Sequence, residues 1–388
     1  MKNDLAIKLH EIVHSGMKTP FYYYDTSLLE RTLHAARASC DQYGFVLHYA
    51  LKANSNESLL PIIRKWIDGA DCVSGNEVQF AFNNGFPSEG IVFAGVGKQD
   101  DEINLALNLD IACFNCESAE EIEVIQQHAA RLGRKARIAL RINPGVDAKT
   151  HQYITTGLEE NKFGINLWEL ESILDLVNSC DHIELKGLHF HIGSQITSLQ
   201  PFKSLCLRMN EVSTWFENRN IRLEHLNAGG GLGINYQHPD EEPVPDFNAF
   251  FNLFHRFLRL RPGQKLHFEL GRSLIGQCGS LISKVLYVKK GQHTNFVILD
   301  AGMTELIRPA LYQSFHKIEN ISGCLTNLIP YDVVGPICES SDCFGKAVFL
   351  PETKRGDIIA IRSAGGYGEV MASRYNLRNM VGSVIYWL

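Results

Sequence analysis

The chain has 388 residues, which is enough for two or three domains with hydrophobic cores of their own. Apolar residues make up 45% of the sequence and charged residues 21%, which excludes a disordered or fibrous protein. The 37 basic and 43 acidic residues give a net charge of -6 and are mixed along the chain, so we expect neither a nucleic acid nor a membrane surface as a partner. No apolar run approaches the roughly 20 residues of a spanning helix, and charged residues interrupt the N-terminal segment where a signal peptide would be apolar. We therefore expect a cytoplasmic protein.

Ten cysteines are spread along the chain without a repeating spacing, which indicates reduced thiols in a long chain of this kind. Cys113 and Cys116 form a C-x-x-C pair, a spacing that zinc and redox sites also use. No second pair accompanies them, and the surrounding residues have the pattern of a buried strand. We predict that both cysteines belong to the core, and we expect no metal site.

Eight short apolar runs alternate with segments of helical periodicity between residues 45 and 270. A strand followed by a helix, repeated eight times, predicts a (β/α)8 TIM barrel. The runs cover residues 45–51, 69–74, 91–96, 111–115, 136–143, 185–193, 223–229 and 265–270.

After residue 270 the pattern changes to strands joined by turns, with few helical segments. This pattern predicts a second, mainly antiparallel β domain, and the early run TPFYYYD (19–25) is expected to join its sheet. We place the barrel at residues 27–265 and the β domain at residues 1–26 and 266–388.

Polar residues and glycines follow several of the predicted strands, where barrel enzymes carry their catalytic groups. Because the carboxyl ends of barrel strands share one rim, we expect these residues to lie together. They are Lys52 after the first strand, Asp71 and Ser74 after the second, His189, His191 and Ser194 after the sixth, Gly229, Gly230 and Gly231 after the seventh, and Glu269, Gly271 and Arg272 after the eighth.

These residue types together indicate pyridoxal 5'-phosphate (PLP) as the cofactor. A lysine facing a pocket is desolvated, which lowers the pKa of its amine and makes Lys52 nucleophilic toward an aldehyde. The glycine run offers backbone N–H groups to an anion, and Arg272 falls in a loop where this barrel often binds phosphate. Glu269 suits the pyridine nitrogen. The glycines match neither nucleotide-binding pattern, which argues against a nucleotide.

His189 and His191 are two residues apart on a strand, so they point to the same side and form a possible metal pair. A metal-dependent barrel hydrolase is therefore one alternative. We see no further histidine or carboxylate set at the other strand ends that completes such a site. A stacking or hydrogen-bonded histidine is favoured.

Seven motifs occur in the order found in the barrel-type PLP-dependent decarboxylases, and the chain from about residue 20 onward resembles the diaminopimelate decarboxylases of that family. The family also includes ornithine and arginine decarboxylases, and alanine racemase shares the fold of a PLP-binding barrel with a β domain. The motifs are HYALKAN, GADCVSGNE, HFHIGSQ, AGGGLG, ELGR, GPICESSD and AGGYG.

The resemblance implies a role for each residue that matches a motif. Lys52 bonds covalently to PLP, His191 stacks on its ring, and Cys338 returns a proton to the substrate carbon after carbon dioxide leaves. Cys338 and Glu339 reach the active site of a neighbouring subunit, so the β domain contributes to a homodimer. The further cofactor residues are Asp71, Ser194, Gly229, Gly230, Gly231, Glu269, Gly271, Arg272 and Tyr367, and the substrate residues are Arg272, Arg308, Tyr312, Glu339 and Tyr367.

The residues expected to contact the substrate favour meso-2,6-diaminoheptanedioate, a small molecule that decarboxylation converts to L-lysine. Arg272 and Arg308 suit a distal carboxylate through charge-assisted hydrogen bonds, and Glu339 suits the distal ammonium. Ornithine decarboxylases resemble this chain with Asp in place of Glu339, and the racemases have an Arg in place of Glu269.

The sequence also leaves two further functions open. One is a related decarboxylase that acts on ornithine, arginine or carboxynorspermidine, and the other is a non-catalytic relative that only binds PLP. The chain departs from the usual family motifs at Leu270, Ser341 and Gly366. None of these departures removes a chemical group, so we expect altered loop rigidity and retained activity.

Overall fold

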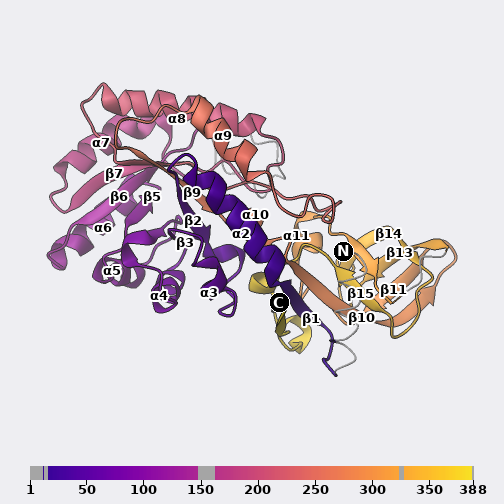
Figure 1. The fold of residues 1–388 in the computed structure, drawn as a ribbon. Helices are drawn as coiled ribbons and strands as arrows, with labels where there is room; N and C mark the ends of the chain where they lie inside the picture. Colours follow the sequence, from indigo (N-terminus) through magenta and orange to yellow (C-terminus); the bar gives the residue numbers. More distant parts are fainter. Residues whose placement is uncertain (1–11, 13–15, 147–161, 323–326, 387–388) are drawn as a thin grey trace. The chain divides into compact units, whose positions relative to one another are not determined.

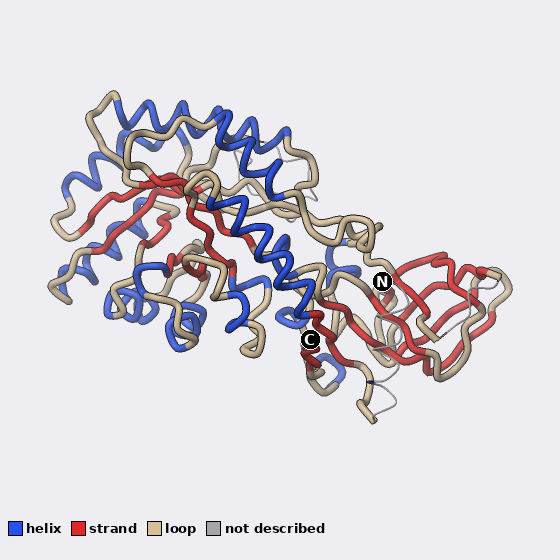
Figure 2. The backbone as a smooth tube through the Cα atoms, viewed as in Figure 1, coloured by secondary structure: helices blue, strands red, loops and turns tan. Residues whose placement is uncertain are grey.

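The computed structural model describes residues 12, 16–146, 162–322 and 327–386. The described residues form two compact units (Figures 1 and 2). The first unit contains the described residues of 33–233 together with 246–271. The second contains the described residues before Leu33, residues 234–245 and those from Arg272 onward.

The first unit is a closed barrel of parallel strands, which confirms the predicted (β/α)8 architecture. Each of the eight apolar runs overlaps one strand, although β5 ends one residue after its run and β7 begins two residues before its run. Helices lie on the outside of the barrel (Figure 1). The strands are β2 (Val46–Ala50), β3 (Gly69–Cys72), β4 (Ile91–Phe93), β5 (Cys113–Cys116), β6 (Ala136–Arg141), β7 (Ile183–His189), β8 (His225–Asn227) and β9 (Lys265–Leu270). The main helices are α3 (Leu60–Ile63), α4 (Gly75–Asn83), α5 (Asp100–Asn108), α6 (Ala119–Arg131), α7 (Leu170–Ser179), α8 (Gln200–Glu217) and α9 (Phe247–Phe257).

The loops before α4 and α6 carry serines that start these helices. Ser74 and Ser118 each accept a hydrogen bond from the backbone N–H three residues later, at 3.2 Å, which satisfies one of the unpaired amides of the first turn. Cys113 and Cys116 of β5 are 2% and 0% exposed, as predicted for core residues.

Aromatic packing fixes the position of β9 in the barrel. Phe268 lies against three phenylalanines of α9, Phe250, Phe251 and Phe254, with ring centroids 4.8 to 5.4 Å apart and steeply inclined planes. Successive residues of a strand point to opposite faces. Because Phe268 points out toward α9, its neighbour Glu269 points into the barrel.

The second unit is built on a mainly antiparallel sheet, also as predicted. The path β12-β15-β10-β11-β13-β14 is joined at β10 by β1, which also pairs in parallel with β16. The run at residues 19–25 therefore joins this sheet as expected. The strands are β1 (Phe21–Asp25), β10 (Gly279–Lys290), β11 (Asn295–Leu299), β12 (Ile318–Asn320), β13 (Leu328–Val334), β14 (Cys343–Pro351), β15 (Ile358–Ile361) and β16 (Ser383–Tyr386). The helix α2 (Thr26–Asp41) begins in this unit, and two short helices, α10 (Arg272–Ile275) and α11 (Arg308–Tyr312), follow later in the chain.

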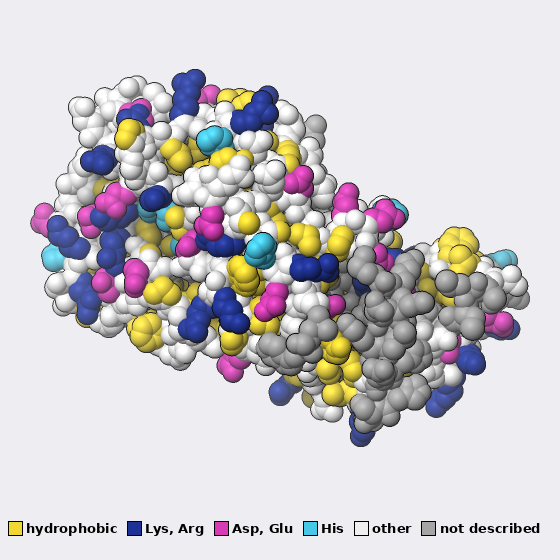
Figure 3. Space-filling model, in the orientation of Figure 1, with side chains coloured by type: hydrophobic (Ala, Val, Ile, Leu, Met, Phe, Trp, Pro, Cys, Tyr) yellow, Lys and Arg dark blue, Asp and Glu magenta, His cyan; other side chains and the backbone are white. Residues whose placement is uncertain are grey.

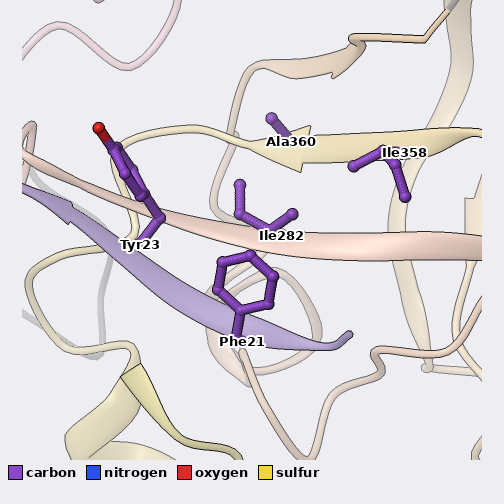
Figure 4. Packing of buried hydrophobic residues seen from close by; sticks show 5 residues of the cluster. All are labelled: Phe21, Tyr23, Ile282, Ile358 and Ala360. Atoms are coloured by element: carbon purple, nitrogen blue, oxygen red, sulfur yellow. The ribbon is translucent and has the colours of Figure 1, made fainter. Parts of the chain in front are cut away.

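One row of apolar side chains ties three of these strands together (Figure 4). Phe21 of β1 is in register with Ile282 of β10, which is in register with Ala360 of β15. Tyr23 and Ile358 extend the cluster along the same face, and all five side chains are buried. This face removes apolar surface from water and fixes the register of β1.

The surface carries charges of both signs. On the face drawn in Figure 3, basic and acidic side chains are interspersed, in keeping with the mixed charge of the sequence. None of the helices within the described ranges is long and apolar enough to cross a membrane.

Three histidines stack inside the barrel between β2, β8 and β9. The ring of His267 lies 5.1 Å from that of His48 and 4.8 Å from that of His225, and His48 Nε2 is 3.1 Å from His267 Nδ1. Burial lowers the pKa of all three, and the charge of a neighbouring imidazolium would lower the pKa of His225 and His267 further. The cluster is therefore neutral near pH 7.

We expect His225→Gln to reduce the loss of stability in acid. The folded-state pKa of His225 is lowered to about 4, against 6.5 in the unfolded chain. Between these values the unfolded chain binds a proton that the folded chain does not, so stability falls as the pH falls. Between pH 7 and pH 4 the free energy of unfolding of the variant should therefore fall by on the order of 3 kcal/mol less than that of the wild type. Urea denaturation at several pH values measures this, with the same substitution at exposed His238 as the control. Equal pH slopes for wild type and variant would contradict the expectation.

Candidate active site

Lys52 and Asp71 form an ion pair at the carboxyl ends of neighbouring barrel strands. Lys52 lies in the turn that follows β2, and its Nζ donates a hydrogen bond to Asp71 Oδ2 at 2.7 Å. The lysine side chain is 37% exposed, whereas the aspartate side chain is 1% exposed. Burial and the negative charge of Glu269 raise the pKa of Asp71, and Lys52 opposes that rise. Asp71 Oδ1 accepts no hydrogen bond from the described residues.

Glu269 lies buried inside the barrel and receives hydrogen bonds at both oxygens. His189 Nε2 lies 2.9 Å from Oε2, and the side-chain amides of Asn227 and Asn115 donate to Oε1 at 2.6 and 3.3 Å. Burial opposes the negative charge, but His189 and Lys52 outweigh it and hold the pKa of Glu269 well below its ordinary value. The barrel therefore keeps a buried carboxylate ionised.

His191 and the glycine run lie in adjoining loops. Gly230 N donates to His191 Nδ1 at 3.3 Å, and Gly229 N donates to Asn227 Oδ1 at 2.8 Å. The backbone N–H groups of Gly229 and Gly230, which we expected to bind an anion, thus donate hydrogen bonds to side chains of the protein. Burial, with the positive charges of Arg141 and Lys52, lowers the pKa of His191 well below its ordinary value, so its imidazole is neutral.

Close packing explains why glycine occupies two of these positions. A Cβ at Gly230 would lie 2.2 Å from the backbone oxygen of Glu269. A Cβ at Gly271 would lie 2.8 Å from Cβ of Ala53, in the turn that carries Lys52. At these two positions the loops that follow β8 and β9 therefore lie too close to neighbouring atoms for any residue with a Cβ.

These features fit PLP. A partly exposed strand-end amine matches an aldehyde, and a buried ionised carboxylate matches a pyridine nitrogen. The unsatisfied Oδ1 of buried Asp71 is a further acceptor without a protein partner among the described residues. Ser194 belongs to the same barrel unit, in the loop after His191.

The second unit brings together Arg272, Arg308 and Tyr367 of the expected site. Tyr236 Oη accepts a hydrogen bond from Nη1 of Arg272 at 2.7 Å and from Nη1 of Arg308 at 2.8 Å. The guanidinium of Arg272 also lies over the ring of Tyr367, 4.6 Å from its centroid. Tyr367 has φ +58°, a conformation that costs energy in a non-glycine residue and is concentrated at functional sites. Tyr312 is the last residue of α11, the helix that Arg308 begins.

Cys338 and Glu339 lie in an exposed part of the second unit. The backbone N–H of Cys338 donates to Asn376 Oδ1 at 3.1 Å, and Glu339 Oε1 accepts a hydrogen bond from Tyr375 at 2.6 Å. Cys338 and Glu339 are both exposed to solvent in the single chain.

Asn115, Asn227 and Tyr236 are site residues that the sequence motifs did not reveal. Asn115 and Asn227 are the polar residues near the ends of two apolar runs, a signal that resembles the one used for Asp71. Tyr236 follows the glycine run by five residues and carries no such signal. Its partner Arg308 is 72 residues away in the sequence.

Comparison with known proteins agrees with this geometry. Residues 26–276 match a family model described as the pyridoxal binding domain of pyridoxal-dependent decarboxylases. The diaminopimelate decarboxylase of Bacteroides thetaiotaomicron is 56% identical over 365 residues, which are 94% of either chain. The chain belongs to the diaminopimelate decarboxylase family.

Other members of the family are similar over nearly the whole chain. The diaminopimelate decarboxylase of Neisseria meningitidis serogroup B is 41% identical over 95% of this chain and 87% of its own. The crystal structure of diaminopimelate decarboxylase from Helicobacter pylori in complex with L-lysine has a TM-score of 0.91 at 39% identity, covering 97% of this chain and 94% of that one. The family resemblance in the sequence motifs is therefore confirmed.

We expect His189→Leu to destabilise the barrel by leaving buried Glu269 without its main donor. Removing one partner of a buried pair lowers the free energy of unfolding by about 3–5 kcal/mol. The pKa of Glu269 rises in the variant, so the loss should shrink at acid pH, where the carboxyl is protonated. Urea denaturation at pH 8 and pH 5 measures both effects.

The double variant His189→Leu/Glu269→Gln serves as the control because it also removes the charge. It should recover much of the lost stability at pH 8. If His189→Leu alone is as stable as the wild type, His189 does not stabilise the buried charge of Glu269.

Proposed function

We propose that the protein is a PLP-dependent carboxy-lyase that converts meso-2,6-diaminoheptanedioate to L-lysine and carbon dioxide. The observation that carries the proposal is a strand-end amine, Lys52, in the same barrel mouth as a buried carboxylate, Glu269, that stays ionised. The 56% identity to a diaminopimelate decarboxylase and the similarity to a family member crystallised with L-lysine support the reaction and the substrate.

The barrel residues would hold the cofactor. When bound, PLP supplies an aldehyde that joins amino groups and a protonated pyridine ring that withdraws electrons from the bond that breaks. Lys52 would bind the aldehyde covalently, Glu269 would accept a hydrogen bond from the pyridine nitrogen, and His191 would pack on the ring. The remaining cofactor residues would be Asp71, Ser194, Gly229, Gly230, Gly231, Gly271, Arg272 and Tyr367.

Residues of the second unit would bind the substrate and supply a proton. Arg272 and Arg308, with Tyr312 and Tyr367, would hold the distal carboxylate, and Glu339 would hold the distal ammonium. In the reaction the bond between the α-carbon and its carboxylate breaks and carbon dioxide leaves. The same carbon then takes one proton, which the thiol of Cys338 would donate.

We also propose that the working enzyme is a homodimer in which a second copy covers the exposed segment around Cys338. Leu377, Tyr375 and Met380 of that unit are 96%, 48% and 46% exposed and lie close together in the sequence, so they form a local group of exposed apolar side chains. A self-complementary interface of a dimer would bury them. A cytoplasmic location is proposed because the cysteines in the described ranges are all free thiols.

We expect the purified protein with added PLP to release lysine and carbon dioxide from meso-diaminopimelate far faster than it decarboxylates L-ornithine. Lys52→Ala should abolish this turnover and the visible absorbance that develops when PLP binds covalently. Lys65→Ala, at an exposed lysine, is the matched control and should behave as the wild type. Faster turnover of ornithine would contradict the proposed substrate.

Mixing two inactive variants tests whether active sites are shared between subunits. Cys338→Ala should lower turnover by about 10²- to 10⁴-fold through loss of a proton donor. When Cys338→Ala and Lys52→Ala subunits pair at random, about half of the dimers are mixed, and in each mixed dimer one of the two active sites has both residues intact. The mixture should therefore recover roughly one quarter of the wild-type rate. Mixed dimers that form but recover no activity would show that Cys338 serves its own subunit.

A further inference from the structure

Two buried guanidinium groups share one phenolic oxygen in the second unit. Nη1 of Arg272 and Nη1 of Arg308 donate to Tyr236 Oη at 2.7 and 2.8 Å. The three residues are only 6%, 3% and 8% exposed, respectively for Arg272, Arg308 and Tyr236. Like charges repel strongly away from water. The shared acceptor is therefore what the structure uses to hold the two cations at a fixed spacing.

A neutral histidine holds Arg308 from a second direction. Nη1 of Arg308 also lies 2.9 Å from His316 Nε2, while His316 Nδ1 lies 2.9 Å from the backbone oxygen of Arg362. Since that carbonyl can only accept, Nδ1 carries the proton and Nε2 accepts from Arg308. Burial and the charge of Arg308 lower the pKa of His316 to about 3, which keeps the ring neutral.

Two acidic side chains of this unit, Asp240 and Glu319, are paired with cations other than Arg308. Asp240 is paired with Lys317 at 2.9 Å and with Arg362 at 3.0 Å. Glu319 is paired with the same two residues, at 3.0 and 2.7 Å. Arg308 is thus held by Tyr236 and His316, which are both neutral, and its Nε has no hydrogen-bond partner among the described residues.

Neutral acceptors leave the charge of Arg308 available to a bound anion. A carboxylate of the protein in their place would compete with the ligand, whereas a hydroxyl and an imidazole fix the guanidinium without cancelling its charge. Burial and the charge of Arg272 lower the pKa of Arg308, so an anion that binds there also relieves an unfavourable charge.

We propose that Tyr236 and His316 are positioning residues that set the geometry of Arg272 and Arg308 and thereby select substrates that carry a second carboxylate. This inference rests on the proposed function, in which the two arginines hold the distal carboxylate. Neither residue touches the bond that breaks, so both act on binding of the substrate and not on the chemical step.

The test uses the PLP-loaded enzyme and the variant Tyr236→Phe, which keeps the ring and removes only the shared oxygen. L-Lysine retains the distal carboxylate of the substrate, whereas cadaverine is the same diamine without it. The dissociation constant of L-lysine, measured by calorimetry, should rise roughly 10- to 100-fold, the effect of losing a hydrogen bond to a charged group. The dissociation constant of cadaverine should stay unchanged.

Turnover of meso-diaminopimelate gives a second measurement. In Tyr236→Phe the KM should rise while kcat changes by less than about threefold, because uniform binding is lost and the chemical step is not. Tyr331→Phe is the matched control, since Tyr331 is also a buried tyrosine whose hydroxyl accepts a hydrogen bond, from Thr353 N at 3.3 Å. It should leave both dissociation constants unchanged.

A second variant keeps the proposal testable if Tyr236→Phe does not fold. His316→Leu removes the other neutral acceptor of Arg308 and should also weaken L-lysine without weakening cadaverine. If both ligands weaken together, or if neither does, the positioning role is wrong.

Failure of the proposed function gives a different result. In that case the wild type does not turn over meso-diaminopimelate, yet the ratio of the two dissociation constants still tests Tyr236. If the wild type turns over meso-diaminopimelate but the ratio of the dissociation constants of L-lysine and cadaverine is the same in the variants, the positioning role is wrong and the proposed function stands.

Discussion

The negative charge of Glu269, kept ionised inside the barrel, is the constraint on which the mouth of the barrel depends. A buried carboxylate is costly unless its oxygens receive hydrogen bonds and a positive charge lies near. His189, Asn227 and Asn115 supply the bonds from three other strands or their ends, and Lys52 supplies positive charge. Because these donors come from around the barrel, the site forms only when the barrel closes.

Two buried carboxylates of the barrel, Asp71 and Glu269, have pKa values shifted in opposite directions. Glu269 has several donors and a lowered pKa, whereas Asp71 has one cation and an oxygen without a partner among the described residues, and its pKa is raised. Environments that push apart the pKa values of similar groups are typical of sites that divide roles between them. Asp71 therefore depends on Lys52 for its charge, and Glu269 does so to a much smaller extent.

The sequence predicted the barrel well because most of its strands are buried on both faces and are therefore nearly continuous apolar runs. It also located Lys52, Asp71 and Glu269, since a charged residue at the end of such a run is conspicuous. It missed Asn115 and Tyr236, whose importance comes from partners 154 and 72 residues away in the sequence. Local periodicity carries no information about such pairs, which only the closed fold brings together.

The supporting residues of the two units follow opposite rules. Around Glu269 the protein satisfies the charge fully, so this group stays fixed and ionised. Around Arg308 the described residues supply two neutral acceptors, Tyr236 and His316, which fix the cation in place without cancelling its charge. A satisfied charge suits a permanent role toward a cofactor that remains bound, whereas an unsatisfied one suits a substrate that must bind and leave. The difference in partners therefore distinguishes Glu269, an expected cofactor residue, from Arg308, an expected substrate residue, on electrostatic grounds.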